Sequence, residues 1–517
     1  MRKSKTARRT SIAALTLLAA GGPALAADSL SDSIEQFLQN TQTKLDETKI
    51  WKFHLKPSLR ESAIWTDNVF LNDDDEDNVQ LLSVTDKTTK VVTTNPARLA
   101  RIAARTPEFR DTATQGRQGD FIIQSDLGLD FTVPVNPSYS KAFRVNDQMT
   151  LLGVHVKNQE YLDNNDLDNT SVTLRSDLFG FLSDILNVSW GNGFWIRAKD
   201  DYSQLRDPLD TTIRQLRRDG LGTIRTFRDF SRTENTANLD VGYNGNLLDV
   251  TVGYEHYQLL LQKAELRQAE HTRQNVHVEA GLPCPEWEAQ RLFMRWDYWN
   301  YNFARADVYD TDSGLSSHSE QILNDADVFR GVIGIEGPMI SDKMAIRIES
   351  GYENWNPGNE APSGGDRNHF SKWVGMVRAA YSPWDESERN TKFQLQYKRS
   401  VGYSAISNFN AEHDVRFSIF HEVLPKRLDA DMTIAFTSTV PSNGPVRHLV
   451  EAGAGATYHL YKQFDISLRY LIRHETTNKE IQTNSAFESG NSLFQYRIQS
   501  DGAFIQNIVE LAFLLHF

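Results

Sequence analysis

Two stretches of this 517-residue sequence concentrate charged side chains that could bind ions. One is a run of five consecutive acids, Asp73, Asp74, Asp75, Glu76 and Asp77, whose clustered oxygens suit hard divalent cations. The other repeats arginine among scattered aspartates, and its anion-binding candidates are Arg206, Arg214, Arg217, Arg218, Arg225 and Arg228. The alternatives are a solvated loop tip for the acids and, for the arginines, an outer loop neutralised by its own ion pairs.

Signatures of catalysis are missing from the sequence. It has no Gly-x-Ser-x-Gly, His-Glu-x-x-His or phosphate-binding loop, and its histidines are scattered. The single cysteine, Cys284, stands between two prolines and is interpreted as an unpaired turn residue. We therefore expect no enzyme, no cofactor and no resident metal centre.

The N-terminus predicts export. A basic segment ends at Arg9, an apolar run covers Ile12 to Ala20, and Ala24-Leu-Ala26 is a small-x-small cleavage site. Residues 1–26 are thus a predicted signal peptide. Residues 27–50 are polar with a weak apolar stripe, which predicts a short helical segment in the periplasm or, alternatively, a partial plug.

From Trp51 onward, segments with apolar side chains at every second position follow one another. In 464–477, for example, Ile466, Leu468 and Tyr470 alternate with Ser467 and Arg469. The predicted strands are 52–66, 119–133, 148–162, 169–181, 185–201, 232–244, 247–261, 272–282, 287–304, 322–337, 342–355, 368–382, 391–405, 411–423, 428–440, 448–461, 464–477 and 501–517. This gives about 18 strands, with 16 as the alternative count.

Connections between these strands are alternately tight and long, as in bacterial outer-membrane barrels with short periplasmic turns and long outer loops. The mean hydropathy is −0.49, and no stretch approaches the roughly 18 apolar residues of a transmembrane helix. A net charge of −13 disfavours a nucleic-acid partner. The sequence therefore predicts an all-β fold, a transmembrane antiparallel β-barrel over 51–517 in the outer membrane.

Aromatic residues near strand ends are expected to form two interfacial girdles. The residues assigned to them are Tyr161, Trp190, Trp195, Tyr254, Tyr257, Trp296, Trp299, Trp373, Tyr381 and Tyr403. The last strand ends on Phe517 and resembles the closing strand of bacterial outer-membrane barrels, which implies recognition of Phe517 by the barrel assembly machinery.

The positions opposite the apolar ones predict the lumen wall. Its basic candidates include Arg291, Arg295, Arg347, Arg378, Arg416, Arg469 and Arg473. They outnumber the acids assigned to the same face, so we expect a wall that favours anions. An Arg206 to Arg228 loop folded into the lumen would form a constriction of the same preference.

Both ends of the chain resemble a known family. Leu55-Lys-Pro-Ser-Leu59 and Trp65-Thr-Asp-Asn-Val-Phe-Leu71, together with Leu468-Arg-Tyr470, Arg473 and Asn507 near the C-terminus, are similar to outer-membrane β-barrel porins found with exopolysaccharide systems. The resemblance implies an outer-membrane barrel with a role in moving or assembling polysaccharide. It assigns no site residues.

The expected function is a channel for passive or facilitated passage of solutes, such as an anionic saccharide or an exported exopolysaccharide. The alternative is a plugged structural or assembly protein of a polysaccharide machine. Expected partners are outer-membrane lipid, lipopolysaccharide and polysaccharide, and the oligomeric state is left open.

Overall fold

The structure is a computed structural model that describes the chain in segments separated by gaps. The described residues are 54–68, 78–86, 88–103, 105, 119–134, 148–181, 193–206, 231–245, 247–262, 270–284, 290–304, 306–310, 317–321, 325–338, 343–357, 370–384, 390–402, 409–441, 446–477, 481–489, 492–500 and 504–516. The predicted signal peptide (1–26), the predicted periplasmic segment (27–50) and Phe517 lie outside them. No helix within these ranges is long and apolar enough to cross a bilayer.

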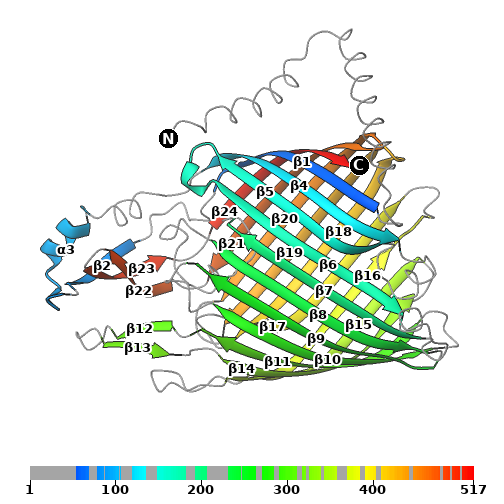
Figure 1. The fold of residues 1–517 in the computed structure, drawn as a ribbon, viewed down its shortest axis with the longest axis horizontal. Coiled ribbons are helices and arrows are strands. Elements are labelled where there is room, and N and C mark those ends of the chain that lie inside the picture. Colours follow the sequence, from blue (N-terminus) through cyan, green and yellow to red (C-terminus); the bar gives the residue numbers. More distant parts are fainter. Residues whose placement is uncertain are drawn as a thin grey trace, which may run out of the picture. The chain divides into compact units, whose positions relative to one another are not determined.

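Eighteen antiparallel strands pair into one closed barrel (Figure 1). They are β1 (His54–Thr66), β4 (Asp120–Pro134), β5 (Gln148–Tyr161), β6 (Asn169–Phe181), β7 (Phe194–Leu205), β8 (Arg232–Asn244), β9 (Asp249–Leu261), β10 (His271–Pro283), β11 (Arg291–Phe303), β14 (Ala326–Pro338), β15 (Met344–Pro357), β16 (Phe370–Tyr381), β17 (Thr391–Gly402), β18 (Asn410–Leu424), β19 (Leu428–Pro441), β20 (Arg447–Tyr461), β21 (Phe464–Thr477) and β24 (Phe504–His516). The predicted fold and the count of eighteen are confirmed, and the alternative of sixteen is wrong. β7 ends at Leu205 rather than at the predicted residue 201.

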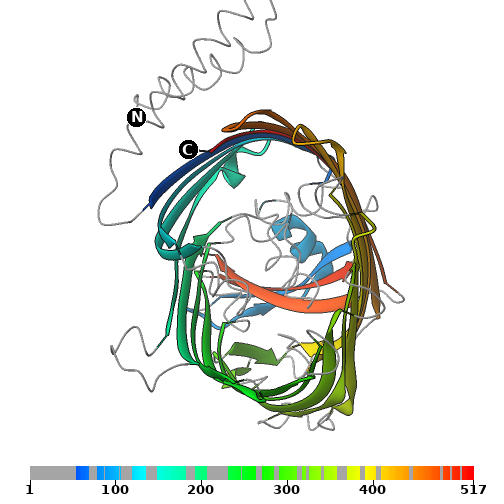
Figure 2. The same ribbon diagram turned by 90° about the vertical axis from the view of Figure 1, so that its right-hand side faces the viewer.

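The ring closes between the first and last strands, and Figure 2 shows it along the barrel axis. β1 pairs with β24 from Ser58 opposite His516 to Thr66 opposite Ile508. Short turns join strands at one end, for example Pro425 to Arg427 between β18 and β19, where Lys426 adopts a positive φ of 61°. The other end carries the long connections and is called the loop end below.

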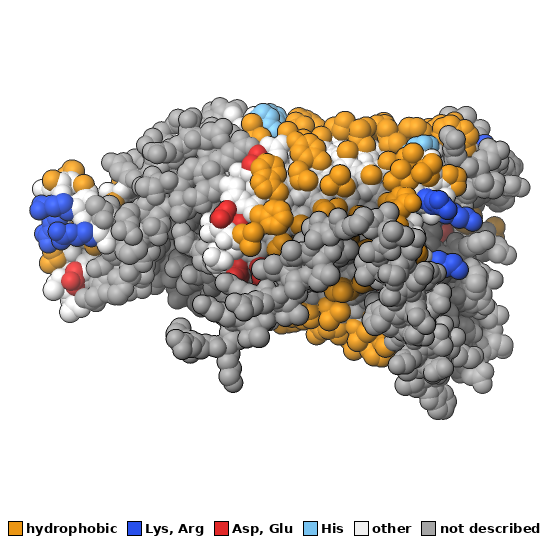
Figure 3. All heavy atoms as spheres, turned by 90° about the horizontal axis from the view of Figure 1, so that it is seen from above, with side chains coloured by type: hydrophobic (Ala, Val, Ile, Leu, Met, Phe, Trp, Pro, Cys, Tyr) orange, Lys and Arg blue, Asp and Glu red, His pale blue; other side chains and the backbone are white. Residues whose placement is uncertain are grey.

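Alternation gives the barrel an apolar outer face. Leu395, Leu468, Ile333 and Phe329 are exposed on it, and Figure 3 shows hydrophobic side chains gathered along the described part of the barrel surface. A soluble protein would not present such a surface to water, whereas lipid accepts it. The chain is therefore an outer-membrane protein.

The aromatic residues assigned to the girdles divide between the two faces. Tyr254, Trp296, Trp373 and Tyr381 are exposed on the outer face, as predicted. The assignment is wrong for four others, which lie on the inner face: Tyr161, Trp195, Tyr257 and Trp299. Trp190 and Tyr403 lie outside the described residues.

A hydrogen-bonded clasp holds the seam between β1 and β24 at the loop end. The Asn507 backbone N–H and Nδ2 each lie 2.6 Å from an oxygen of the Asp67 carboxylate. The Asn68 side chain donates to the Ile505 carbonyl at 2.8 Å, and the Gln506 side chain donates to the Asn68 carbonyl at 2.9 Å. Tyr470 on β21 donates to Asn507 at 2.6 Å. Residues next to the first strand and in the last strand thus fix the closure of the barrel.

The long connections contain further secondary structure that the sequence did not predict as strands. β2 (Asn78–Asp86), β3 (Val92–Thr93), β22 (Ile481–Ser489) and β23 (Ser492–Ser500) form a four-stranded sheet, and β12 (Ala306–Asp310) pairs with β13 (Ser317–Gln321). A short helix, α3 (Pro96–Ala103), follows Asn95. Asn95 caps it, accepting from the N–H groups of Ala97 and Arg98 at 3.1 and 3.2 Å.

Candidate functional site

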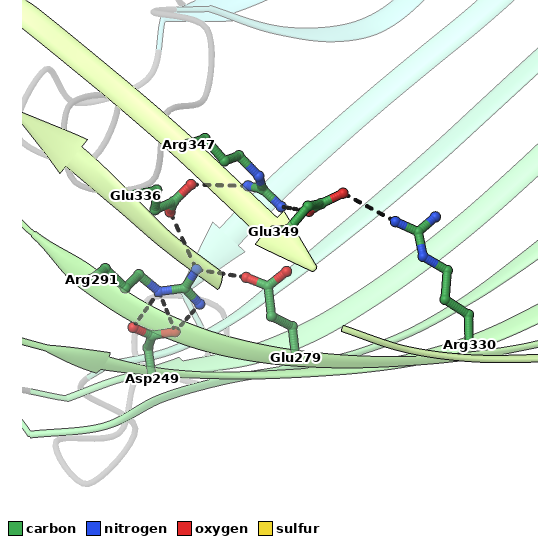
Figure 4. A network of polar contacts seen from close by, with 7 residues as sticks. All are labelled: Asp249, Glu279, Arg291, Arg330, Glu336, Arg347 and Glu349. Atoms are coloured by element: carbon green, nitrogen blue, oxygen red, sulfur yellow. Dashed lines mark hydrogen bonds and ion pairs between the residues drawn. The ribbon is translucent and has the colours of Figure 1, made fainter. Parts of the chain in front are cut away.

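The inner wall of the barrel carries the charged side chains that the strands position. A network on five neighbouring strands, β9, β10, β11, β14 and β15, is centred on Arg291 and Arg347 (Figure 4). The Arg291 guanidinium pairs with Asp249, with Glu279 at 2.7 Å and with Glu336 at 3.3 Å. Figure 4 also shows Glu336 bridging to Arg347 at 2.9 Å, and Glu349 joining Arg347 to Arg330 at 3.2 and 3.0 Å.

These pairs hold the wall together and also neutralise part of it. Arg347 lies over the Phe293 ring at 4.5 Å, so the ring fixes the guanidinium from below. Elsewhere Arg295 pairs with Asp297 at 2.7 Å, and Arg473 with Glu451 at 2.8 Å. Forked N–H donors match carboxylate geometry, which makes such pairs rigid. Four of the seven predicted wall arginines are thus engaged by half-buried or buried carboxylates.

Glycine in a middle strand lets other pairs reach across it. Asp130, Gly153 and Arg175 are consecutive cross-strand partners on β4, β5 and β6, and Arg175 lies 2.6 Å from Asp130. A Cβ on Gly153 would overlap both side chains. Gly253 on β9 likewise lies between His277 and Asp240, and its lack of a side chain lets these two residues approach to 3.3 Å.

Register aligns five of the seven predicted wall arginines in one row. Each member directly opposes the next on the neighbouring strand; the row, named here the arginine row, is Arg291, Glu336, Arg347, Arg378, Gln396, Arg416, Ala435, Glu451, Arg473 and Gln506. Arg291 is the first residue of β11, at the short-turn end, and Gln506 is near the start of β24, at the loop end.

The arginine row therefore crosses the wall obliquely from one membrane face to the other. Nine steps at the usual strand spacing of about 4.8 Å make it about 43 Å long. With strands tilted by about 40°, it rises by roughly 28 Å, which is comparable with the apolar band of such barrels. Arg295 and Arg469 lie on the same inner face but off the row.

Three arginines of the inner wall are exposed to the lumen. Arg416 and Arg469 have side chains 52% and 57% exposed, with their nearest carboxylates 3.9 and 3.6 Å away. Arg378 is exposed and faces the side-chain amide of Gln394. Among the residues that the structure describes, no carboxylate pairs with Arg378. A solute at mid-wall therefore meets guanidinium groups first.

The inner wall is covered at the loop end. Trp355 and Tyr161 are each 1% exposed although both belong to the inner face. Tyr301, Val328, Trp355 and Val374 pack in one apolar cluster. A side chain that faced open water alone would be exposed, so the packing of this cluster covers the inner face at the loop end.

A half-buried acid lies beside this covered zone. Asp325, just before β14, accepts the Phe303 backbone N–H at 2.7 Å. Burial raises the pKa of its carboxyl, against the lowering effect of that hydrogen bond. The burial of Asp325 is in accord with a covered wall at this end of β14.

The loop residues singled out by the sequence are mostly not described. Arg206 is exposed, and its backbone N–H donates to the Ser171 hydroxyl at 3.1 Å. Arg214, Arg217, Arg218, Arg225 and Arg228, and the acidic run Asp73 to Asp77, lie outside the described residues. The proposed constriction and cation-binding loop therefore stay predictions.

Sequence reasoning missed several wall residues that the structure brings into the ion pairs. These are Arg175, Arg273, Arg330, Asp177, Glu255 and Glu336. Period-two alternation within the predicted strands places each of them on the charged face, so the signal was available. With these carboxylates included, the wall is a mixed array of ion pairs rather than a mainly basic surface.

Comparisons with known proteins give only distant structural likeness. No family model matches the sequence, and no curated protein matches it. Pseudomonas aeruginosa OpdK, solved with vanillate, is 9% identical with a TM-score of 0.39, over 90% of this chain and 99% of its own. A BenF-like porin from Pseudomonas fluorescens is 9% identical with a TM-score of 0.40, over 90% and 100%. The alcaligin receptor FauA of Bordetella pertussis is 9% identical with a TM-score of 0.35, over 88% and 76%.

Proposed function

We propose that the barrel is a selective diffusion channel that passes anionic solutes across the outer membrane. The observation that carries this proposal is the arginine row, which presents guanidinium groups along the inner wall from one end of the barrel to the other. A barrel of 18 strands is wide enough to keep an aqueous lumen beside its side chains.

The paired and the exposed arginines of the arginine row have different roles. Arg291, Arg347 and Arg473 are held by carboxylates and stiffen the wall. Arg378 and Arg416 flank Gln396 and are exposed, so an anion can lie between them and replace part of its hydration. Weak sites in succession allow an anion to enter and to leave, as conduction requires.

An anionic saccharide is the solute class that suits the row best. Its repeated carboxylates would contact several guanidinium groups at once, and the second contact then forms at high effective concentration. The covered zone around Trp355 and Tyr301, at the loop end, would restrict the passage of bulky solutes. Export of an exopolysaccharide would use the same contacts.

Planar bilayers with the purified full chain test the proposal. In a KCl gradient the zero-current potential should have the sign of anion selectivity. An acidic oligosaccharide should reduce the ion current, and its uncharged counterpart should do so less. A cation-selective potential would contradict the proposal.

A second candidate, a plugged assembly protein of a polysaccharide machine, is favoured by the covered inner wall at the loop end. It predicts no resolvable conductance in the same experiment, together with binding of the acidic oligosaccharide to detergent-solubilised protein.

A further inference from the structure

One arginine of the barrel lies on the outer face and not on the face that lines the lumen. Arg399 on β17 opposes Gly375 on β16 and His413 on β18. Those positions share a face with Val377 and Val415, which are exposed on the apolar outer surface. The Arg399 guanidinium carbon lies 5.6 Å from the centre of the Trp373 ring, and Trp373 is exposed on that surface too.

Arg399 also has no anionic partner among the residues that the structure describes. Within the described segments, no carboxylate and no hydrogen-bond acceptor faces its guanidinium, and its Nε is buried without an acceptor. The inner-wall arginines Arg291, Arg347 and Arg473, in contrast, all have carboxylates within 3.3 Å. An unpaired guanidinium facing lipid is costly unless it lies at the headgroup level and finds an anion there.

Its neighbours extend the polar surface across five strands. Successive cross-strand partners are Arg399, His413, Ser438, His448 and Thr476, named here the outer polar row. The ring of His413 lies 3.1 Å from the Tyr397 hydroxyl, and His448 stacks on Phe436 with ring centres 5.8 Å apart. Alternation puts no acidic residue on the outer face of β17 to β21 within the described residues.

The outer polar row lies at the loop end of these strands. His413 is the fourth residue of β18 and His448 the second of β20, both following long-side connections. Exposed apolar side chains continue below it, including Leu395, Ile434 and Leu468. Long loops face the outside of the cell, so this row lies at the headgroups of the outer leaflet and the apolar positions lie along acyl chains.

We propose that the outer polar row binds the phosphate of a lipopolysaccharide lipid A. A guanidinium suits a phosphate because its forked donors reach two oxygens, and the phosphate supplies the anion that Arg399 lacks. His413, Ser438 and His448 offer further donors, and the exposed Leu395 and Ile434 receive the acyl chains. The site is separate from the lumen and does not depend on the channel function.

The test measures binding of purified lipid A to the full chain in detergent by native mass spectrometry. Wild type should bind bisphosphorylated lipid A about tenfold more tightly than dephosphorylated lipid A. Arg399→Gln should lose this preference, and Arg399→Lys should keep part of it, since it retains charge without the fork. Arg416→Gln, on the neighbouring strand but facing the lumen, is the matched control and should bind as wild type does.

Several outcomes would overturn the proposal. They are equal binding of the dephosphorylated lipid, an unchanged preference in Arg399→Gln, or equally tight binding of phosphatidylglycerol. Dissociation of a stable oligomer by Arg399→Gln, with lipid A binding unchanged, would assign this surface to contacts between copies of the chain. A heat-modifiable gel shift shows that each variant is folded; if Arg399→Gln fails it, His413→Gln and Arg399→Lys carry the comparison.

Discussion

Replacing both Arg378 and Arg416 by glutamine is expected to reduce the anion preference of the channel without changing its fold. The two arginines flank Gln396 on neighbouring strands and are exposed to the lumen. Glutamine keeps the length and polarity of the side chain and removes only the charge. Arg291, Arg347 and Arg473, which make the closer ion pairs, are left unchanged, so the stability of the wall should be preserved.

The size of the effect follows from Coulomb's law. At the Cα separation of a hydrogen-bonded antiparallel pair, an anion beside Gln396 is about 5.5 Å from each guanidinium. In water each charge then contributes about 0.75 kcal/mol, or about 1.5 kcal/mol for both. Screening at 0.1 M salt, with a Debye length of about 10 Å, leaves about 0.9 kcal/mol; at 1 M, with about 3 Å, it leaves about 0.2 kcal/mol.

The assay is the zero-current potential in planar bilayers under a KCl gradient. The chloride-to-potassium permeability ratio should fall about fourfold near 0.1 M and by less than twofold near 1 M. Arg399→Gln removes a charge from the outer face of the same sheet and is the control. An unchanged ratio in the double variant, a drop that does not depend on salt, or an equal drop in the control would refute the reasoning.

Three further substitutions probe the wall and its seam. Gly253→Ala places a methyl group where the Asp240 and His277 side chains lie, and it should lower the free energy of unfolding by about 1–3 kcal/mol. The measurement is the denaturation midpoint in detergent. Gly402→Ala, which has nothing within 4 Å of its added carbon, is the control and should leave the midpoint unchanged. Glu336→Gln weakens the bridge between Arg291 and Arg347 and should lower the free energy of unfolding by about 1–2 kcal/mol in the same assay. An unchanged midpoint would mean that the bridge does not contribute to stability. Asp67→Ala removes the carboxylate that accepts two hydrogen bonds of the seam clasp, so amide hydrogen exchange should accelerate in β24 and stay unchanged in β18. Uniform exchange throughout the barrel would contradict a local clasp.

The strands and their inward faces were predictable because alternation is local. Each strand shows its own pattern, so Arg291 and Arg473 could be assigned to one face without knowledge of their neighbours. The same rule would have corrected the girdle assignment. Trp296 and Trp299 are three residues apart, an odd spacing, and therefore must point to opposite faces of one strand.

Relations between strands were not predictable from one sequence. The arginine row depends on register across ten strands, and a slip of one residue in any pair would move the later members to the outer face. The network at Glu336 likewise joins strands whose partners only the fold determines. In the four-stranded sheet, β2 pairs with β23, and Asn78 lies opposite Gln499. A local sequence pattern cannot predict a partner so distant in the sequence.

The seam clasp connects Asp67 with Asn507, which are 440 positions apart in the chain. Synthesis of the last strand must therefore finish before the first strand can acquire its neighbour across the seam. Until then both terminal strands have unpaired edges that could pair with other polypeptides. The unfolded chain therefore needs chaperones in the periplasm. Removal of either terminal strand would leave an unfinished sheet with the same hazard for the lifetime of the protein.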